Sequence, residues 1–454
     1  MREHAKIGWM TAFAVACLAC FPWAAHAQTA AEWEAQQEAA GNKSDRIMAQ
    51  AMQHEGLLAQ YLAMHHAYDS DHSKAFQLIF GQYISWYLSF LGNYPDAVRT
   101  FSVSQPPDPE DNPSPLAANS GYTAQPALDA IPELAKNYRI VLFNEAHNVA
   151  LTRSLTVQLL SRLRQEGFDY FAAETLSASD TGLSTRGYPT DHSGFYTEEP
   201  IYAEMVRTAL KLGFKVVAYE AVTPTGNTDV RETEQASNLY QQVFEKDPAA
   251  RLVVNAGYDH IVKSGVYLDG SSMAEHLSRL THLPMLSVEQ TMLYPRPSSS
   301  GDHPYYTAVM KTLKPTSPIV FVNTDGKPWT LRSNYDVSVF FPRERIDRDR
   351  PEWLSLGGLR VPYFISADRC QGDYPCLIEA RYSDEGPDAI PADRLMLDRV
   401  SQIDPGYRIN VYTSNQDAPS GNLYLRPGKY HLTFSDGNGR VLHKEDIVVI
   451  GASP

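Results

Sequence analysis

Between residues 125 and 345, short apolar runs alternate along the chain with longer segments of helical periodicity. The apolar runs lie at residues 139–145, 168–175, 214–221, 251–258, 284–291 and 318–325. The longer segments between them include residues 151–167, 198–213 and 231–247. Runs that are apolar throughout, rather than at every second residue, are typical of strands that are buried on both faces. The alternation therefore predicts an α/β domain over residues 125–345, with a mostly parallel sheet and flanking helices.

The chain before this domain has a different pattern. Apolar residues recur every three or four positions over residues 28–102 and β-branched residues are few, which predicts a helical segment. Residues 103–124 follow and contain the Pro-rich acidic stretch SQPPDPEDNPSP. This composition predicts an extended linker between the helical segment and the α/β domain.

After about residue 345 the helical periodicity ends. Strand-like runs alternate with Gly, Asn, Asp and Pro, and one of these runs, YRINVYTS, spans residues 407–414. The stretch SDGNGR at residues 435–440 is typical of a hairpin turn. The pattern predicts a small antiparallel β-sandwich over residues 355–454. Its PGKYHLTF run and DGNG turn resemble the last hairpin of immunoglobulin-like modules, which usually support a neighbouring domain.

The first 27 residues are typical of a secretory signal peptide. Arg2 and Lys6 precede a long apolar stretch, and Ala25-His26-Ala27 supplies the small residues of a cleavage site. We therefore expect cleavage after Ala27 and a periplasmic or secreted protein. Two alternatives remain open, a retained membrane anchor and a lipid anchor on Cys20.

The charge of the chain bears on its partners. Cleavage of the signal peptide removes two basic residues and one acidic residue, so the formal charge changes from −14 to −15. An acidic protein repels phosphate backbones, and nucleic-acid binding is therefore not expected. No later apolar run approaches the roughly 20 residues that a membrane-spanning helix requires.

Cysteine is rare in the mature sequence. Cleavage removes Cys17 and Cys20 and leaves Cys370 and Cys376 in the stretch CQGDYPC. Two cysteines this close together in an exported protein predict one local disulfide. A metal site is the rival interpretation, although no histidine lies near these cysteines in the sequence.

Acidic residues and histidines lie at the ends of four successive predicted strands. Glu145 and His147, in FNEAHN, end the first strand and Glu174 ends the second. Glu220 ends the third strand, and His260 follows the fourth. Parallel strands end at one edge of their sheet, where α/β proteins bind ligands. Each residue alone could cap a helix or lie on the surface, but Glu is a poor N-cap. The pattern therefore predicts a functional site.

The loops and helices after these strands supply further polar candidates. Arg153 lies at the start of the first predicted helix, Tyr196 in the long loop after the second strand, and Arg231 after the third. We expect these residues, with Glu220, to contact substrate, although ordinary surface placement is an equal alternative for the loop residues.

Three of these strand ends also resemble a known group. The stretches IVLFNEAH, FDYFAAETL and VVNAGYDHI occur in the order found in the erythromycin-esterase-like and ChaN/Tiki-like superfamily, over about residues 127–325. The resemblance aligns the group's Glu-x-His pair with Glu145 and His147, its second acid with Glu174, and its late histidine with His260. Members often have Gly where this chain has Asn144. The resemblance implies water activation in esterase-like members, metal dependence in peptidase-like members, and haem binding in another branch.

The first functional hypothesis is an exported hydrolase of an ester, lactone or amide bond in a small molecule. Its catalytic residues would be Glu145, His147, Glu174 and His260. Either histidine could take a proton from water, and either glutamate could orient it or protonate the leaving group. A serine nucleophile is not expected, because no G-x-S-x-G motif occurs at a strand end.

Two variants of this hypothesis bring in a cofactor. The same four residues could hold a divalent Mn, Co, Zn or Fe ion that activates water, although the zincin motif H-E-x-x-H is absent. Alternatively, the chain is an exported haem- or metal-binding uptake protein, with Tyr196, Tyr219 or Tyr258 as iron ligands. The sequence has no C-x-x-C-H haem attachment motif. A purely structural role of the α/β domain is the remaining alternative.

Overall fold

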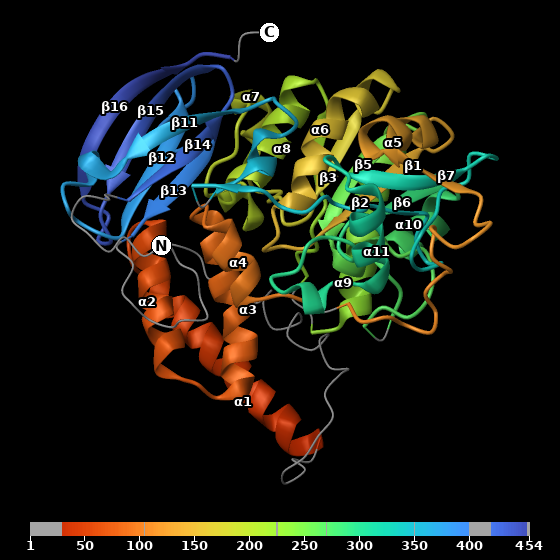
Figure 1. The fold of residues 1–454 in the computed structure, drawn as a ribbon, viewed down its shortest axis with the longest axis horizontal. Helices are drawn as coiled ribbons and strands as arrows, with labels where there is room; N and C mark the ends of the chain where they lie inside the picture. The colour runs from red at the N-terminus through yellow and green to blue at the C-terminus, as the bar shows by residue number, and fades with distance from the viewer. Residues whose placement is uncertain are drawn as a thin grey trace.

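A computed structural model of the chain describes residues 30–451, apart from 104, 224–225, 269, 349 and 399–418. Figure 1 shows N-terminal helices beneath a group of C-terminal strands, with a larger α/β domain beside them. The helices, the central parallel sheet and the small antiparallel C-terminal sheets confirm the predicted fold class. The predicted signal peptide, Cys20 and the run at 407–414 lie outside the described residues.

The central sheet has six strands in the order β4-β3-β5-β2-β6-β8, and every neighbouring pair is parallel. In chain order the strands are β2 (Ile140–Glu145), β3 (Tyr170–Ala173), β4 (Lys215–Ala218), β5 (Leu252–Gly257), β6 (Met285–Glu289) and β8 (Val337–Ser338). All residues of β2, β3, β5 and β6 are buried. Because both faces of these strands are covered, their sequences are apolar runs rather than alternating ones.

Helices cover both faces of this sheet. One face packs against α5 (Ala127–Ala135), α6 (Leu151–Gln165) and α8 (Pro200–Lys211), whose buried side chains share a core with Val141 and Phe143 of β2. The other face packs against α9 (Thr228–Leu239), α10 (Met273–Thr281) and α11 (Pro304–Leu313). Ile140 and Leu142 belong to that second core. Alternate residues of one strand thus serve two cores.

One predicted strand takes a different place. The run at 318–325 forms β7 (Ile319–Asn323), which pairs antiparallel with β1 (Tyr122–Pro126) in a separate two-stranded sheet. Its placement in the parallel sheet was therefore wrong, and β8 lies next to β6 instead. The backbone of β7 also bonds to later residues, since Ile319 and Phe340 exchange two hydrogen bonds of 3.0 and 2.9 Å. A buried apolar run does not by itself determine the partner strand.

The N-terminal helical segment consists of α1 (Ala30–Ala51), α2 (Leu57–Ser70), α3 (Lys74–Phe90) and α4 (Tyr94–Thr100), as its periodicity predicts. Almost all of α3 is buried. The Pro-rich stretch then runs along the α/β domain: Asn112 N donates to Leu331 O at 2.7 Å, and Trp329 Nε1 donates to Pro113 O at 2.9 Å.

The C-terminal region contains small antiparallel sheets. β11 (Val361–Ser366) pairs with β14 (Ser420–Leu425), while a four-stranded sheet has the order β13-β12-β15-β16. Its strands are β12 (Cys376–Tyr382), β13 (Asp393–Leu397), β15 (Gly428–Ser435) and β16 (Val441–Val449). A further short pair is β9 (Ile346–Asp347) with β10 (Arg350–Pro351). The predicted disulfide between Cys370 and Cys376 is confirmed.

Ion pairs join α8 to this C-terminal region. Arg207 makes two hydrogen bonds of 2.7 Å with Glu385, and Glu204 accepts a hydrogen bond of 2.5 Å from Arg426. Arg360 lies 3.1 Å from the same Glu204 carboxylate. The C-terminal sheets therefore hold the helix that follows the loop of Tyr196.

Within the described residues, no helix is both long and apolar enough to cross a membrane.

Candidate functional site

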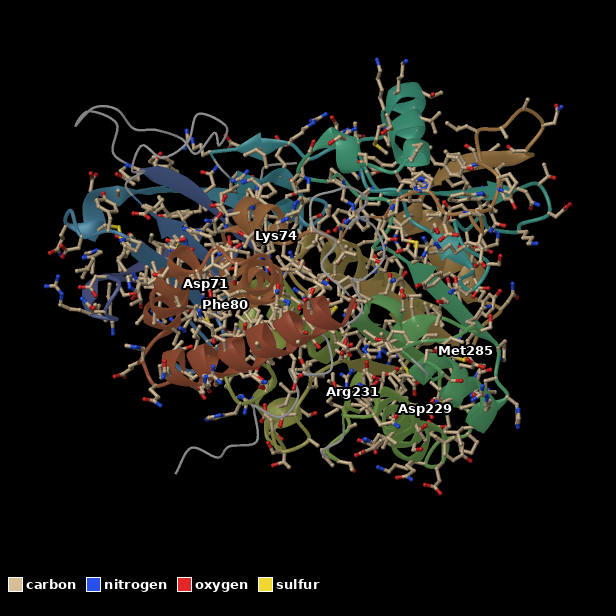
Figure 2. All side chains as sticks on the ribbon, turned by 90° about the horizontal axis from the view of Figure 1, so that it is seen from below. Asp71, Lys74, Phe80, Asp229, Arg231 and Met285 are labelled. Carbon is tan, nitrogen blue, oxygen red and sulfur yellow. A yellow bond between two sulfur atoms is a disulfide. The ribbon has the colours of Figure 1, made fainter. Side chains whose placement is uncertain are left out.

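The predicted residues meet at the carboxyl edge of the four adjacent strands β4, β3, β5 and β2. Parallel pairing places Glu145 opposite Gly257, and Ala173 opposite Asn255, so that Glu174 follows directly beside them. Figure 2 labels Arg231 with Asp229 in the first turn of α9, in the part of the α/β domain that carries the site. The structure brings together all eight predicted catalytic and substrate-contacting residues: Glu145, His147, Arg153, Glu174, Tyr196, Glu220, Arg231 and His260.

The first half of the site is built on the Glu145 carboxylate. His147 Nδ1 lies 3.2 Å from Glu145 Oε1. Arg153 of α6 donates to both carboxylate oxygens, at 2.6 and 2.7 Å, and Asn255 Nδ2 donates to Oε2 at 2.7 Å. All four side chains are buried. The carboxylate is thus held in one orientation with the imidazole at its edge.

These contacts determine the protonation state of Glu145. Burial by itself raises the pKa of a carboxyl group, but the nearby Arg153 and His147 outweigh it and lower the pKa of Glu145 to about 2. Glu145 is therefore ionised at neutral pH. It favours the His147 tautomer with a proton on Nδ1, which leaves Nε2 as the acceptor.

Aromatic rings enclose His147. The ring of Tyr196 stacks on the imidazole with centroids 4.1 Å apart and planes 16° apart, and Tyr258 approaches edge-on at 5.2 Å. Gly257 of β5 closes a third side. A Cβ at Gly257 would lie 2.2 Å from His147 Cε1 and 3.0 Å from Glu174 Oε2. Only glycine permits this close approach of the backbone.

The second half of the site is built on His260. Its Nδ1 lies 2.7 Å from Glu232 Oε2, which also accepts a hydrogen bond of 2.7 Å from Met273 N. His260 Nε2 lies 3.3 Å from Glu174 Oε1. Glu174 also accepts hydrogen bonds from Arg231 Nη2 at 2.9 Å and Gly257 N at 2.5 Å. Glu174 therefore connects His260 to Gly257, the residue that closes one side of His147.

Two carboxylates keep His260 protonated. Burial lowers the pKa of an imidazole, but Glu232 and Glu174 outweigh burial and raise the pKa of His260 to about 10. Burial also raises the pKa of Glu174, but His260, His147 and Arg231 together hold it well below its usual value. At neutral pH this half therefore contains an imidazolium and an ionised glutamate.

Glu220 joins the site through Arg231. Arg231 donates to the two oxygens of Glu220 at 3.2 and 3.1 Å, and Gln235 Nε2 donates to Oε1 at 2.6 Å. The Glu220 carboxylate also accepts from Thr175 N at 3.2 Å. Thr175 has φ of 63°, and Tyr258 has φ of 40°. Residues other than Gly rarely adopt such backbone angles. Where they do, the position is often part of a functional site.

Asn144 has a structural function in this chain. Its Oδ1 accepts a hydrogen bond of 2.6 Å from Gln290 N, and its carbonyl oxygen accepts one of 2.7 Å from Gln290 Nε2. Its Nδ2 donates to Thr291 Oγ1 at 3.3 Å. The side chain therefore ties the end of β2 to the end of β6 and leaves Glu145 and His147 in place.

A further buried carboxyl group lies at the end of β6. Glu289 is fully buried, and burial raises its pKa to about 7, although hydrogen bonds from Thr291 oppose that shift. Its run, PMLSVEQT, resembles the other strand ends, but Glu289 belongs to neither half of the site described above. The sequence alone did not identify it as a candidate.

The residues as arranged do not fit a bound metal ion. Arg153 occupies both oxygens of Glu145, while Arg231 and Gly257 N occupy those of Glu174. A metal ion would have to displace these donors. In the part of the chain that the structure describes, no group of three or more His, Cys, Asp or Glu side chains could hold a metal.

Two of the three tyrosines that were candidates for iron ligation, Tyr196 and Tyr219, lie inside the protein. Tyr196 and Tyr219 are buried, at 4% and 0% exposure, and Tyr196 is stacked on His147. Burial, reinforced by Glu174, holds the pKa of both phenols well above the usual value. Both phenols therefore carry their protons in this structure, and the Tyr196 ring is already packed against His147.

Sequence patterns did not single out four residues that hold the site: Asn255, Gly257, Glu232 and Glu199, whose Oε2 accepts a hydrogen bond of 3.2 Å from Arg153 Nη1. Asn255 lies inside an apolar strand, and a polar residue in such a run is a signal that could have been used. Glu232 directly follows Arg231, but its helical face becomes known only when α9 is placed against β5. Glu199 precedes Pro200 at the start of α8, a position typical of a cap.

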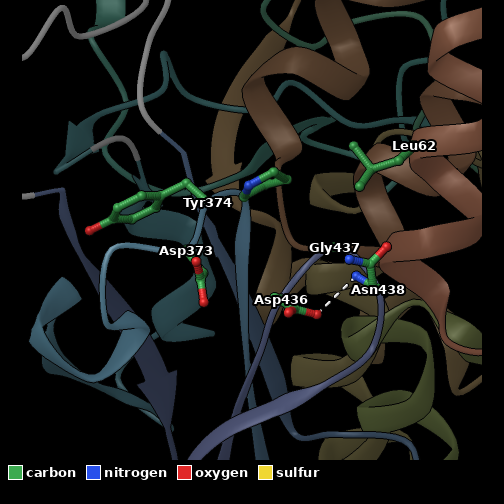
Figure 3. Close-up of a pocket in the computed structure, with 7 residues that line it drawn as sticks. Leu62, Asp373, Tyr374, Asp436, Gly437 and Asn438 are labelled. Carbon is green, nitrogen blue, oxygen red and sulfur yellow. Dashed lines mark hydrogen bonds between the residues drawn. The ribbon is translucent and has the colours of Figure 1, made fainter.

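A surface hollow lies away from this site. Leu62 of α2 and residues 373–375 and 436–438 of the C-terminal region line it, and Asp436 Oδ1 accepts a hydrogen bond of 2.9 Å from Asn438 N (Figure 3). Its acidic side chains are engaged, since Arg440 bonds to both Asp373 and Asp436. The hollow contains none of the predicted catalytic residues.

Comparisons with known proteins assign no family. No family model matches this chain, and no curated protein is significantly similar to it. The type III effector HopBA1 aligns with 50% of this chain and 100% of its own, at 12% identity and a TM-score of 0.31. A structure described as "Bacterial protein toxins" aligns with 60% of this chain and 48% of its own, at 11% identity and a TM-score of 0.28. RRSP, a MARTX toxin effector domain from Vibrio vulnificus CMCP6, aligns with 56% of this chain and 55% of its own, at 15% identity and a TM-score of 0.27. Likenesses this distant assign neither a family nor an activity to this chain.

Proposed function

We propose that this chain is an exported hydrolase of an ester, lactone or amide bond, with His147 as the general base. The observation that carries the proposal is the fixed Glu145–His147 pair. Glu145 is held between Arg153 and Asn255 and orients the imidazole through Nδ1. A histidine oriented in this way can accept a proton from water at Nε2. The resemblance of the strand ends to erythromycin-esterase-like proteins points to the same chemistry.

We assign different functions to the two histidines from the charged groups around them. His260, with a pKa of about 10, already carries its proton at neutral pH and is unsuited to act as the base. It is suited to stabilise negative charge, as is Arg231 at 3.3 Å from its Nε2. Glu145 and Glu174 are both ionised, so neither supplies the proton to the leaving group.

The proposed reaction needs no covalent intermediate. His147 Nε2 takes one proton from a water molecule while the water oxygen forms a bond to the carbonyl carbon. The carbonyl electron pair moves to oxygen, where Arg231 and His260 stabilise the negative charge. When the carbonyl re-forms, the bond to the leaving group breaks, and the His147 imidazolium returns its proton to that group.

The two rings that contact His147 differ in exposure. Of the rings that contact the imidazole, Tyr196 is buried, whereas Tyr258 is half-buried. Arg231, whose side chain is 15% exposed, reaches solvent on the His260 side. We propose that substrate enters past Arg231 and that the Tyr258 ring turns away from His147 to admit the carbonyl group.

A substrate screen with a matched histidine control tests this function. The purified mature protein, His147→Ala and His303→Ala would be assayed on panels of esters, lactones and amides. His303 is a suitable control because it is also buried and lies 3.1 Å from a carboxylate, that of Asp111, at its Nε2. Removal of a general base should lower kcat/KM by about 10²–10⁴-fold.

The expected result is loss of activity in His147→Ala alone, with its thermal transition within a few degrees of the unaltered protein. Equal activity of His147→Ala and His303→Ala would reject His147 as the base. Hydrolysis of none of the three panels by the unaltered protein would reject the proposed reaction class.

A further inference from the structure

Hydrogen bonds connect helix α4 of the N-terminal helical segment to the residues that hold the Glu145–His147 pair. Tyr94, the first residue of α4, donates a hydrogen bond of 2.8 Å from its hydroxyl group to Glu199 Oε1. Glu199 Oε2 accepts a hydrogen bond of 3.2 Å from Arg153 Nη1. Arg153 in turn holds Glu145 through two shorter hydrogen bonds. An unbroken series of polar contacts therefore connects Tyr94 to the carboxylate beside His147.

Every side chain of this series is buried. Glu199 and Arg153 have 0% exposure, and Tyr94 has 2%. Burial raises the pKa of Glu199 although Arg153, the amides of α8 and Tyr94 oppose the shift. The charge of Glu199 therefore depends on its hydrogen-bond donors. Loss of one donor would favour its neutral form and weaken its hold on Arg153.

The helical segment makes two more contacts at the same place. Asn148, the residue after His147, donates from Nδ2 to Ala97 O at 3.1 Å and Phe101 O at 2.7 Å. Trp86 of α3 packs edge-on against Tyr196, the ring stacked on His147, with centroids 6.1 Å apart. The helical segment thus contacts both the residue after His147 and the ring stacked on its imidazole.

We propose that Tyr94 is a positioning residue of the hydrolytic site. The inference rests on the proposed function, because the reaction requires His147 to be held by Glu145. Tyr94 fixes Glu199, Glu199 fixes Arg153, and Arg153 fixes the carboxylate that orients the imidazole. The N-terminal helical segment is accordingly a part of the catalytic unit, not a separate module attached to it.

A structural function of the same hydrogen bond makes a different prediction. Glu199 also caps α8, where it accepts hydrogen bonds of 2.8 Å from both Ile201 N and Tyr202 N. If Tyr94 served only to support this cap, its removal would lower stability without changing the orientation of His147. Catalysis and stability must therefore be measured separately.

The test compares Tyr94→Phe with Tyr83→Phe in the full mature chain. Tyr83 is a suitable control because it is also buried in the helical segment and donates to a carboxylate, Asp45 Oδ1, at 3.1 Å. Within the part of the chain that the structure describes, Asp45 has no hydrogen bond or ion pair with a residue of the site, and Phe keeps the aromatic ring at both positions. Steady-state kinetics on an ester hydrolysed by the unaltered protein would be combined with thermal unfolding of each variant.

Tyr94→Phe should lower kcat by about three- to tenfold, as expected for one buried hydrogen bond to a charged group, and should leave KM within about twofold. Tyr83→Phe should leave both constants unchanged, while its melting temperature should fall by about as much as that of Tyr94→Phe. Glu199→Gln, which removes the charge opposite Arg153, should lower kcat at least as much as Tyr94→Phe. An unchanged kcat in Tyr94→Phe, or an equal loss in Tyr83→Phe, would overturn the inference.

A second readout does not depend on hydrolysis. In protein labelled with 15N-histidine, long-range 1H–15N spectra report which ring nitrogen of His147 carries the proton, and His147→Ala identifies its signals. The inference predicts altered His147 signals in Tyr94→Phe and unaltered signals in Tyr83→Phe. If the unaltered protein hydrolyses nothing but this difference is present, the reaction class fails while the positioning by Tyr94 stands. Identical spectra in both variants would reject the positioning function.

Discussion

The two histidine halves of the site have similar partners but different charge balances. His147 Nδ1 lies next to Glu145, and His260 Nδ1 lies next to Glu232. Arg153 makes two hydrogen bonds to Glu145, whereas Arg231 is 3.9 Å from Glu232 and divides its charge among several carboxylates. An arginine that neutralises the first glutamate leaves less negative charge for its histidine. The placement of one arginine therefore changes how much negative charge a His–Glu pair presents to its imidazole.

The largest effects should distinguish the glutamates of the two halves. Glu145→Gln leaves Arg153 buried with only Glu199 as a charged partner and removes the group that fixes the tautomer of His147. We expect kcat to fall by about 10³–10⁴-fold and the free energy of unfolding to fall by roughly 3–5 kcal/mol. Glu232→Gln removes a partner of His260 but strands no arginine, so kcat should fall by only about tenfold.

Steady-state kinetics and urea unfolding of both glutamine variants check this ranking. Each substitution keeps the size of the side chain, so that changes in packing are small. If Glu232→Gln lost more activity than Glu145→Gln, His260 and not His147 would be the better candidate for the base.

An intermediate effect is expected from Gly257→Ala, which lies between the halves. Its Cβ would lie 2.2 Å from His147 Cε1, and the imidazole would have to move away from its position. We expect kcat to fall about 10–100-fold and stability to fall by about 1–3 kcal/mol. Gly41→Ala is the control, because the structure offers open space at that helical position and Ala favours helices. Similar kinetics for both variants would show that the approach of Gly257 to His147 is not required.

A change of pH, unlike the substitutions above, leaves every side chain in place and tests the His260 half through stability alone. The pKa of His260 is about 10 in the folded protein, above the ordinary value of about 6.5 expected in the unfolded chain. The folded state therefore binds more protons between these values, so its stability falls as pH rises from 6.5 toward 10. This group contributes at most about 1.4 kcal/mol per pH unit.

Urea unfolding at pH 6.5, 8 and 9 measures this slope. In Glu232→Gln, which removes the largest cause of the raised pKa of His260, the slope should be smaller than in the unaltered protein. Equal slopes in the two proteins would contradict the assignment of a permanent proton to His260.

Much of the fold follows from periodicity in the sequence. The runs that became β2, β3, β5 and β6 are apolar because helices cover both faces of these strands, and this local signal was sufficient to predict a parallel sheet. The run of β7 carries the same signal, yet it pairs with β1, because its partners come from distant parts of the chain. Periodicity reports burial and does not report the neighbour.

The site shows the same division. Glu145, His147, Glu174 and Glu220 could be predicted together because parallel strands bring their carboxyl ends to one edge. Glu232 and Glu199 could not, because each lies on or before a helix whose contacts depend on how that helix packs. The same limit applies to the assignment of the base: the sequence named two histidines, and the surrounding charges distinguish them.

The sequence by itself determined that helices and a parallel sheet form, that β2, β3, β4 and β5 are followed by acidic residues or histidines, and which cysteines are close enough to pair. These properties depend on neighbours in the chain or on the direction of a strand. The tertiary structure decided that Arg153 faces Glu145, that Glu232 and Glu174 share His260, and that Tyr94 reaches Glu199 from 105 residues away. Buried charges acquire their protonation states from such distant partners, since burial leaves each group only the counter-charges that packing brings to it.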